Sequence, residues 1–563
     1  MLLETGNIQQ IHNLEQANRH ACKLLMNSYI REFGGDCAGS LSLQADDKTY
    51  SVSFPVSGVI VSGRLAFYSA IGEHEYESFQ VGGDCGCGGK LDYADLARWI
   101  VKELRQAYPD ISDERADDFC RRIENSCRNV ALYIGESDRG AVMAGYLSSE
   151  QSLLYGHPMH PFPKNTIGFS DQEVRMYGPE LRASFRLCYW AVRKDVFVQE
   201  RAVRSSRLKL HESVLAHAER MLGQERNKYE LLPMHPWQYG HVQMSAAVQA
   251  YMEERKLVPL GACGPLAYPT SSVRTVYIPV MQCNLKLPLD IQITNLKRNN
   301  SEEQMRRTLD AANYLLQHGA FAGEINARIA YEEGICSCRF GSDEWTKLFT
   351  VAYRPVEFDA QSTYVLSSLV EAPAAGERSR LFALTGNCEM DLWFQRYLDI
   401  SLLPVVRIAE EKGIHFEAHL QNCLLTLQDG MPHVFIIRDL EGVSVNRDKA
   451  EPDAAGSLFY RKEEAWARTD YYFMVNHLGS LIHALARDNG KAEEHYWSIV
   501  RGTLERELHS SGGQGNEYVE HLLTADAFYA KRNLVSCLAG NSETPSYAAV
   551  GNVMKTMGSE RIG

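Results

Sequence analysis

The sequence of 563 residues lacks the features of exported and membrane-spanning proteins. Its first residues, MLLETGNIQQIHNLEQ, contain no basic segment followed by an apolar one, so we expect no signal peptide. No run approaches the roughly 18 consecutive apolar residues that a membrane-spanning helix requires. These absences predict a cytoplasmic protein that has no membrane partner.

Cysteine patterns that bind metals are missing as well. The 14 cysteines are scattered, and no two are spaced as C-x-x-C. The closest pairs, Cys85/Cys87 and Cys336/Cys338, have no second pair at the spacing of a zinc ribbon. We therefore expect most cysteines to be reduced and buried as small apolar side chains.

An excess of positive charge is also absent. Lys and Arg number 58 against 71 Asp and Glu, which gives a formal net charge of -13. Such a chain is a poor candidate for binding nucleic acid or anionic lipid. A small anionic substrate stays possible, because a local group of Arg and Lys decides its binding. The 45% hydrophobic and 23% charged residues are ordinary for a globular protein.

The familiar nucleotide and hydrolase motifs do not occur. Gly82–Lys90 (GGDCGCGGK) superficially resembles a phosphate-binding loop. However, Asp84 occupies the place of the first glycine, and Leu91 replaces the hydroxyl residue that would bind magnesium. We interpret this segment as a turn. There is no G-x-G-x-x-G opening a helix, no G-x-S-x-G and no H-E-x-x-H.

The chain divides into three stretches, and their patterns together predict an α+β fold. Residues 1–140 combine helical segments with one strand, residues 141–355 show short alternating runs of a mixed or antiparallel sheet, and residues 356–563 are mostly helical. The predicted strand is Thr49–Val61, a hairpin is expected near 415–440, and the helices are Leu91–Tyr108, Asp113–Tyr133, Asp391–Lys412, Trp466–Ala486 and Lys491–Leu508.

The first polar cluster is the run GHPMHPFPK at 156–164, which contains His157, His160 and Lys164. Its three prolines forbid a regular helix, so the histidines cannot share a helical face as they do in zinc proteases. The prolines stiffen the loop and reduce the entropy lost when it holds basic side chains around a ligand. An anion-binding loop and a purely structural loop both remain open.

The second cluster comprises Ser272, Arg274, Lys286 and Arg298. Two alternating runs flank Pro279–Asn284, which predicts a hairpin with Arg274 roughly opposite Lys286. Cations and hydroxyls at one end of a sheet suit a polyphosphate. A solvated cationic face is the alternative.

The third cluster surrounds a predicted hairpin whose turn is Asp429-Gly430. Centring the hairpin on this turn brings Asp439 beside His419, with Asn422 nearby. If the strand already begins at Glu417, then Glu417, His419 and Gln421 share one face. Carboxylate, amide and imidazole groups at one hairpin end suit Mg²⁺ and nucleotide phosphates, and a structural polar network is the alternative.

Taken together and in this order, these runs resemble the NRPS-independent siderophore (NIS) synthetases, the aerobactin-synthetase-like family. The resemblance covers about residues 155–535 and rests on the whole ordered set. Thr166 departs from the pattern, which usually has a basic residue two positions after Lys164. The motifs are G-H-P-x-H-P-x-x-K at 156–164, S-x-R at 272–274, Lys286 with Arg298, E-A-H-x-Q-N at 417–422 and R-D-x-x-G at 438–442.

The resemblance implies an architecture like a cupped hand, with a thumb (1–140), fingers (141–355) and a palm (356–563), in a homodimer. It also implies iron acquisition through siderophore biosynthesis. ATP with Mg²⁺ would adenylate a carboxylate, typically of citrate, and an amine or amino-alcohol acceptor would then attack to give an amide or ester. The products would include AMP and pyrophosphate. No cysteine is expected to be essential.

The resemblance further assigns roles to individual residues. The catalytic set is Lys286, Arg298 and His419. The ATP-binding set is His157, Lys164, Ser272, Arg274, Lys286, Arg298, His419, Asn422 and Asp439. The carboxylate-binding set is His157, His160, Arg298, Arg468, Tyr471 and Lys531, and the magnesium ligands are Glu417, Asn422 and Asp439.

Two other functions fit the same residues. A small-molecule kinase could use Asn422 and Asp439 as metal ligands and would release ADP, and a non-catalytic paralogue would bind ATP without turnover. The acyl acceptor is not fixed by any motif. Free citrate is the expected acid, with a citryl monoamide and 2-oxoglutarate as the alternatives.

Overall fold

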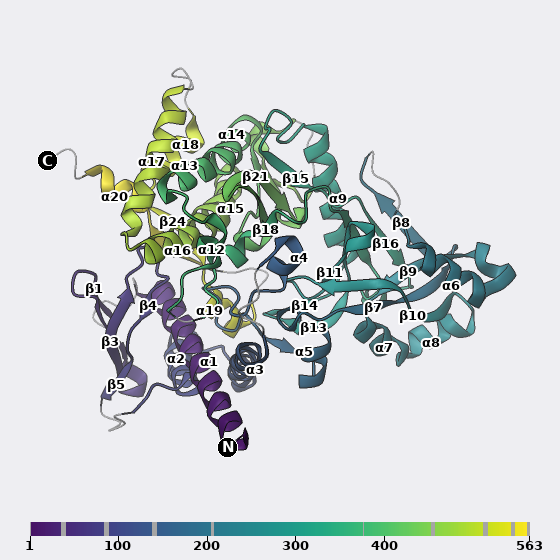
Figure 1. Ribbon diagram of the computed structural model, residues 1–563, viewed down its shortest axis with the longest axis horizontal. Coiled ribbons are helices and arrows are strands. Elements are labelled where there is room, and N and C mark those ends of the chain that lie inside the picture. The colour runs from purple at the N-terminus through teal and green to yellow at the C-terminus, as the bar shows by residue number, and fades with distance from the viewer. Residues whose placement is uncertain are drawn as a thin grey trace.

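The computed structural model describes residues 2–34, 41–83, 89–137, 143–203, 208–374, 376–451, 456–510, 516–541 and 546–559 (Figure 1). The fold is mixed α+β, as predicted. Residues 84–88, with the Cys85/Cys87 pair and the centre of the glycine-rich turn, lie outside the described residues. Of the cysteines in the described part, nine are buried, two are half-buried and all are unpaired, which confirms the prediction for them.

The N-terminal region packs helices on a five-stranded sheet. The predicted strand Thr49–Val61 is wrong as a single element, because a turn at Pro55–Ser57 with Gly58 in the left-handed conformation divides it into two paired strands. Asp92 and Ser112 cap the two predicted helices. The elements are α1 (Leu2–Phe33), β1 (Leu41–Gln44), β2 (Thr49–Phe54), β3 (Val59–Phe67), β4 (Glu75–Tyr76), β5 (Gln80–Gly83), α2 (Tyr93–Ala107) and α3 (Asp113–Glu136).

An antiparallel sheet of eight strands forms the middle of the chain, as predicted. Its spatial order is β8-β16-β17-β12-β11-β10-β7-β9, and it extends to the right of Figure 1. The strands are β7 (Phe185–Arg193), β8 (Phe197–Arg201), β9 (Tyr229–Met234), β10 (Leu257–Pro269), β11 (Thr275–Ile278), β12 (Cys283–Lys286), β16 (Gly334–Cys338) and β17 (Val351–Pro355).

The register of the β11–β12 hairpin differs from the prediction by one residue. Thr275 pairs with Lys286, and Arg274 pairs with Leu287 through a backbone hydrogen bond. The alternation that continues beyond Lys286 belongs to another sheet, because the chain leaves β12 at Leu287. That sheet has three strands in the order β14-β13-β6, namely β14 (Leu296–Arg298), β13 (Leu289–Ile293) and β6 (Thr166–Ile167).

The C-terminal region packs long helices on a sheet with the order β15-β21-β20-β18. The predicted hairpin and its Asp429-Gly430 turn are confirmed, since Gln428 pairs with Met431. The predicted helix Asp391–Lys412 is instead two helices that meet at Ser401. The elements are α13 (Met390–Ile400), α14 (Leu402–Lys412), α15 (Lys462–Thr469), α16 (Gly479–Asn489), α17 (Glu493–Ser510), β15 (Ala327–Ala330), β18 (Thr363–Val365), β20 (Cys423–Gln428) and β21 (Met431–Arg438).

The predicted helix Trp466–Ala486 is continuous but is wound as a π-helix over Asp470–Leu478, between α15 and α16. Such segments in proteins frequently mark functional sites. The remaining helices are α4 (Gly145–Glu150), α5 (Asp171–Tyr177), α6 (Glu212–Leu222), α7 (Pro236–Gln243), α8 (Ala246–Glu253), α9 (Glu302–Gln317), α10 (Asp343–Thr346), α11 (Leu366–Val370), α12 (Arg380–Thr385), α18 (Glu517–Thr524), α19 (Asn533–Ala539) and α20 (Val553–Ser559). The remaining strands are β19 (Ile414–His415), β22 (Ser444–Asn446), β23 (Phe459–Tyr460), β24 (Ala527–Lys531) and β25 (Tyr547–Gly551).

The two ends of the chain share a core. Leu534 and Val535 of α19 are buried in the hydrophobic cluster of the N-terminal region. Their backbone N–H groups donate to the buried carboxylate of Glu32 in α1, at 2.7 and 3.0 Å. This contact fixes α1 against the C-terminal region (Figure 1). No helix in the described part of the chain is long and apolar enough to cross a membrane.

Candidate active site

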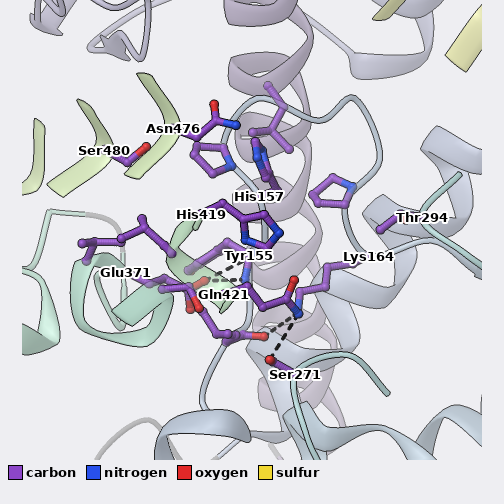
Figure 2. A pocket seen from close by; sticks show the side chains of 18 of the residues that line it. Tyr155, His157, Lys164, Ser271, Thr294, Glu371, His419, Gln421, Asn476 and Ser480 are labelled. Carbon is purple, nitrogen blue, oxygen red and sulfur yellow. Dashed lines mark hydrogen bonds between the residues drawn. The ribbon is translucent and has the colours of Figure 1, made fainter. Parts of the chain in front are cut away.

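A cavity of about 1130 Å³ is lined by residues of all three stretches of the chain. In the view of Figure 2, His157 and His419 lie at its centre, Asn476 and Ser480 on one side, and Gln421 and Ser271 on another. Most of the predicted site residues line this cavity, namely His157, Lys164, Ser272, Arg274, Lys286, Arg298, Glu417, His419, Asn422 and Asp439. The predicted His160, Arg468, Tyr471 and Lys531 do not line it.

Arg274, Lys286 and Arg298 form what we call the cationic end of the cavity. Arg274 Nη1 donates to Asn300 Oδ1 at 2.6 Å, and Arg298 Nη2 donates to Thr294 Oγ1 at 2.8 Å. Neither guanidinium has a carboxylate within 4 Å among the described residues. Burial and the charge of Arg274 together lower the pKa of Arg298 to about 10. Two cations held close together without a directly paired carboxylate make this end suited to a polyanion.

Lys286 faces two carboxylates at the same end. Its Nζ lies 3.0 Å from Asp439 Oδ1 and 3.2 Å from Glu441 Oε2. Burial alone would lower the pKa of Lys286, but these carboxylates raise it above its usual value. Burial alone would raise the pKa of Asp439, but Lys286 and other nearby cations hold it below its usual range. Lys286 and Asp439 are therefore both charged at neutral pH.

A buried ion pair supports the backbone at Asp439. Glu332 Oε1 accepts from Arg354 at 2.7 Å, and Glu332 Oε2 accepts from the backbone N–H of Leu440 at 3.4 Å. Asp439 has a φ of +65°, a left-handed conformation that costs free energy for a residue with a side chain. Glu332 and Arg354 were missed by the sequence analysis, because no motif connects an isolated residue in the loop between β15 and β16 with an isolated residue of β17.

The start of the β20–β21 hairpin differs from the prediction. The strand begins at Cys423, and Leu420–Asn422 is a 3₁₀ turn, so Glu417 does not share a strand face with His419 and Gln421. The groups still converge, because Asn422 Nδ2 donates to the backbone carbonyl of Glu417 at 3.1 Å. Gly442 allows Glu417 to approach, since a Cβ there would lie 2.1 Å from Glu417 Oε2. This contact explains the glycine of R-D-x-x-G.

Two neutral histidines occupy the centre of the cavity. Burial, with the nearby charges of Arg31 and Lys531, lowers the pKa of His157 well below its usual value. Burial also lowers the pKa of His419, although Glu417 and Asp439 act in the opposite direction. His157 Nδ1 accepts from the Met159 backbone N–H at 3.1 Å, which fixes the ring in the proline-rich loop. Because a neutral His157 accepts at Nδ1, it carries its hydrogen on Nε2 and can donate a hydrogen bond to a ligand there, whereas the neutral imidazole of His419 can accept a proton.

The proline-rich loop is held by residues that the sequence analysis did not identify. Glu371 accepts from the backbone N–H groups of Leu154, Tyr155 and Gly156 at 2.8 to 3.3 Å (Figure 2). Arg380 donates to Glu371 at 3.2 Å and completes this clamp.

Lys164 is engaged within the same loop region. Its Nζ donates to Glu180 Oε1 and to the Leu153 carbonyl, both at 2.6 Å. Thr166, which replaces the usual basic residue, accepts from Asn129 at 2.9 Å. The structure therefore gives Lys164 and Thr166 structural contacts in addition to their place on the cavity lining.

Another ion pair joins the hairpin to α4. Arg438 donates to the fully buried Glu150, and Glu150 also accepts from the Ser271 hydroxyl at 2.6 Å. Gln421 Nε2 donates to Ser271 Oγ at 3.2 Å (Figure 2). Ser272, in turn, accepts from the Thr275 backbone N–H at 3.2 Å. The arginine of R-D-x-x-G thus orders the turn that carries the predicted phosphate-binding serine.

The remaining predicted residues lie behind Glu417 and His419. Lys531 Nζ donates to the Tyr472 hydroxyl at 2.5 Å, and the Tyr472 ring centroid is 5.9 Å from that of His419. Burial lowers the pKa of Lys531. Arg468 Nη2 donates to the Tyr460 hydroxyl at 3.2 Å, and Tyr471 is buried in the π-helix.

His160 points away from this group. Its Nδ1 accepts from the Phe162 backbone N–H at 3.2 Å, and its Nε2 lies 3.8 Å from Cys537 Sγ. Burial, with the charges of Arg298 and Arg122, lowers the pKa of His160 to about 3. The structure thus brings the phosphate and metal candidates together on one cavity and leaves His160 and the Arg468, Tyr471 and Lys531 group outside its lining.

Comparison with known protein families gives two matches along the chain. The model described as the IucA/IucC family matches residues 145–368, which contain the cationic end of the cavity. The model described as a ferric iron reductase FhuF-like transporter matches residues 391–546, which contain the β20–β21 hairpin.

Several curated proteins are similar over almost the whole length. The L-2,3-diaminopropanoate–citrate ligase of Staphylococcus aureus is 29% identical, with 96% of each chain covered. The spermidine–citrate ligase of Bacillus anthracis is 25% identical, over 93% of this chain and 94% of the relative. The N(2)-citryl-N(6)-acetyl-N(6)-hydroxylysine synthase of Vibrio mimicus is 26% identical, over 96% and 95%.

Solved structures show the same fold. The ATP-bound aerobactin synthetase IucA of Klebsiella pneumoniae superposes with a TM-score of 0.84 at 23% identity, covering 95% of this chain and 99% of that one. The petrobactin biosynthesis protein AsbB of Bacillus anthracis superposes with a TM-score of 0.82 at 17% identity, covering 98% and 97%.

Proposed function

The chain belongs to the IucA/IucC family, and on this premise we propose that it is an ATP-dependent ligase of siderophore biosynthesis. It joins citrate to an amine and releases AMP and pyrophosphate. One observation supports this most strongly: a single cavity carries two arginines without a directly paired carboxylate among the described residues, an adjacent Lys–Asp–Glu group and two neutral histidines. Of the three curated relatives named above, two are citrate ligases and the third is the synthase of a citryl compound.

The chemistry requires an anion-binding surface of this kind. A carboxylate is a poor electrophile, and its transfer to the α-phosphate of ATP creates an acyl-adenylate with a good leaving group. Citrate and ATP are both polyanions, so Arg274, Lys286 and Arg298 offset their repulsion and stabilise the charge that develops on the α-phosphate. Ser272 and Lys164 would add hydrogen bonds to the phosphates.

Magnesium fits this site as part of the bound nucleotide. Among the described residues, no three His, Cys, Asp or Glu side chains form a metal site alone. Asp439, Asn422 and Glu417 supply oxygen ligands of the type that Mg²⁺ prefers, and phosphate oxygens would complete the set. Glu441 is a further carboxylate beside Asp439. The bound ion would neutralise phosphate charge.

Citrate would lie between the cationic end and the two histidines, against Arg298 and His157. The Lys531, Arg468 and Tyr471 group lies behind Glu417 and gives a second positive region for the carboxylates that do not react. Lys531 acts electrostatically on both His157 and His419, which supports this assignment. His160 is the weakest member of the proposed set, because its ring nitrogens face Phe162 and Cys537.

The second half-reaction is attack of the amine on the acyl-adenylate. The nitrogen must be unprotonated when it attacks, and the neutral imidazole of His419 can accept the proton. The carbonyl–nitrogen bond forms as the bond to AMP breaks, and the proton leaves through the histidine.

The division into thumb (1–140), fingers (141–355) and palm (356–563), the homodimer and a cytoplasmic location are also parts of this proposal. The sharing of one core by α1 and α19 supports the view that thumb and palm form a continuous body.

Nucleotide product analysis tests the proposed function. Purified protein receives Mg²⁺, ATP and a panel of amines, with citrate or 2-oxoglutarate, and pyrophosphate, AMP and ADP are quantified. We expect AMP and pyrophosphate in equal amounts, only with citrate and an amine together. ADP with a phosphorylated acceptor would replace the ligase with the kinase, and ATP binding without nucleotide product would identify a non-catalytic paralogue.

A further inference from the structure

One side of the cavity has no part in the assignments above. We call it the helical wall, and it consists of α1, the segment 66–79, and the residues of the π-helix and α16 that face the cavity. In Figure 2, Asn476 and Ser480 lie on this side of His157. The wall is built from residues of the first and last stretches of the chain, and no motif predicted it.

The loop before β4 is fitted tightly onto α16. Gly479 lacks a side chain, and a Cβ there would lie 2.6 Å from Ile71 Cδ1, so the glycine allows Ile71 to pack against the helix. The backbone N–H of Ala70 donates to Glu493 at 2.9 Å. These contacts hold Glu73 above Ser480 and direct it to the cavity.

Glu73 is the unusual residue of this wall. Its side chain faces the cavity although the residue is only 8% exposed. Glu73 Oε2 accepts from the Ser480 hydroxyl at 2.8 Å. Within the described part of the chain, its other oxygen has no hydrogen bond and neither oxygen has a cation within 4 Å. A carboxylate that is buried in this way requires a positive partner.

The neighbouring charges are already paired. Glu75 lies 2.5 Å from Lys23 and 3.5 Å from both His483 and Arg487. Asp488 lies 2.6 Å from Arg487. His483 and Arg487 also act electrostatically on Glu73, but among the described residues neither lies within 4 Å of it, so one oxygen of Glu73 faces the cavity without a direct partner. Asn476, one helical turn before Ser480, adds an amide that also faces the cavity.

From this geometry we propose that Glu73, with Ser480 and Asn476, binds a protonated amino group of the acyl acceptor. The acceptor is then a diamine-type molecule: one nitrogen attacks the acyl-adenylate near His419, and a second, charged nitrogen is held at Glu73. Leu24 and Phe67 line the cavity on the same wall and suit the short alkyl chain between the nitrogens. This inference rests on the proposed function for the identity of the reaction.

The test compares 1,3-diaminopropane with propylamine, which has the same chain and lacks the second amino group. KM for each amine is measured in the citrate-dependent reaction, and Kd is measured by calorimetry without ATP or citrate. We expect Glu73→Gln to raise both constants for the diamine by about 10–100-fold, the value of a charge-assisted hydrogen bond, with the propylamine values unchanged.

Two further variants keep the result interpretable. Glu136→Gln changes an exposed carboxylate of α3 that is outside the cavity lining and paired with Arg175 at 2.7 Å, and it is expected to behave as wild type. Ser480→Ala removes the hydroxyl beside Glu73 and is expected to give a smaller change in the same direction as Glu73→Gln.

Equal binding of the two amines by wild type, or an equal loss of both in Glu73→Gln, would overturn the inference. The calorimetry does not depend on citrate, so failure of the amine site is distinguished from failure of the proposed function. If wild type bound the diamine selectively but formed no AMP with citrate, only the proposed function would be overturned, and the inference about the amine site would stand.

Discussion

The cationic end and the helical wall of the same cavity balance charge in opposite ways. At the cationic end, Arg274 and Arg298 have no carboxylate within 4 Å among the described residues, although Asp439 and Glu441 act on both from farther away, and a polyanion would supply a direct partner. At the helical wall, Glu73 has no cation within 4 Å among the described residues, although His483 and Arg487 act on it from farther away, and an ammonium group would supply a direct partner. From this difference we expect adenylation to take place at the cationic end and the amine to bind at the helical wall, with the neutral His157 and His419 between the two.

Histidine protonation follows the same division. Burial lowers the pKa of His157 and His419, so both are uncharged at neutral pH. Burial would also lower the pKa of His483 at the helical wall, but the surrounding carboxylates raise it to about 9. The same residue type therefore serves as a base at the centre and as a fixed cation at the wall.

The largest effect is expected from Lys286→Ala at the cationic end. The substitution removes the ammonium that faces the phosphates and leaves Asp439 and Glu441 without their shared cation. We expect citrate-dependent pyrophosphate–ATP exchange to fall by about 100–1,000-fold, with diamine affinity unchanged. Lys297→Ala is the matched control, because Lys297 also lines the cationic end of the cavity but its side chain is 65% exposed. This variant should retain exchange. A loss of diamine affinity in Lys286→Ala would show that the two ends are not separate.

A smaller effect is expected from Gly442→Ala, which acts on the metal candidates only. The new Cβ would lie 2.1 Å from Glu417 Oε2 and must displace that carboxylate. We expect exchange to fall by about 10–100-fold and to need more Mg²⁺ for half-maximal rate. Gly240→Ala in α7 is the control, because a Cβ there meets nothing within 4 Å. An unchanged Mg²⁺ requirement would remove Glu417 from the site.

The variant His483→Gln tests the positive charge of His483 at the helical wall through the pH dependence of the unfolding free energy. The unfolded chain has an ordinary histidine pKa near 6.5, so between pH 6.5 and about 9 the folded protein binds a proton that the unfolded chain releases. The stability from this proton is complete below pH 6.5 and is lost as pH rises through 9. We expect wild type to lose about 3 kcal/mol of unfolding free energy more than His483→Gln over this range. Parallel pH profiles in urea unfolding would contradict the paired state of His483.

The smallest effect on turnover is expected from Cys423→Ser. Cys423 is fully buried, and burial raises the pKa of its thiol well above the usual value, so no thiolate is available. We expect normal exchange and amine KM, with stability lower by about 1–2 kcal/mol for the buried hydroxyl. If Cys423→Ser remained folded but were inactive, the reaction would require a covalent step at Cys423, which contradicts the proposed mechanism.

The two ends also differ in how far the sequence predicted them. Arg274, Lys286 and Asp439 are in short polar runs beside strands, and the Asp429-Gly430 turn limits the hairpin register to within a residue. Local patterns therefore brought these groups together correctly. The start of the strand at Cys423 was not predictable, because a 3₁₀ turn and a strand have the same apolar and polar pattern over three residues.

Glu73, Glu332 and Glu371 could not have been found in this way. Each is a single acid whose contacts are far away in sequence: Glu73 meets Ser480, Glu332 meets Arg354, and Glu371 meets the loop at Leu154. The contact of Glu73 depends on the packing of the loop before β4 on α16, and the contacts of Glu332 and Glu371 depend on segments that meet only in the folded chain. Periodicity encodes none of this packing. The interruption of the predicted helix at Ser401 was missed for a similar reason, since the apolar pattern continues across it.

The most direct measurement is citrate-dependent pyrophosphate–ATP exchange without any amine, in wild type and in Glu73→Gln. If the two half-reactions use separate ends of the cavity, exchange is equal in wild type and in Glu73→Gln, and the KM for the diamine is raised in Glu73→Gln. Exchange that requires an amine, or that falls with Glu73→Gln in a folded protein, would contradict the division of the cavity.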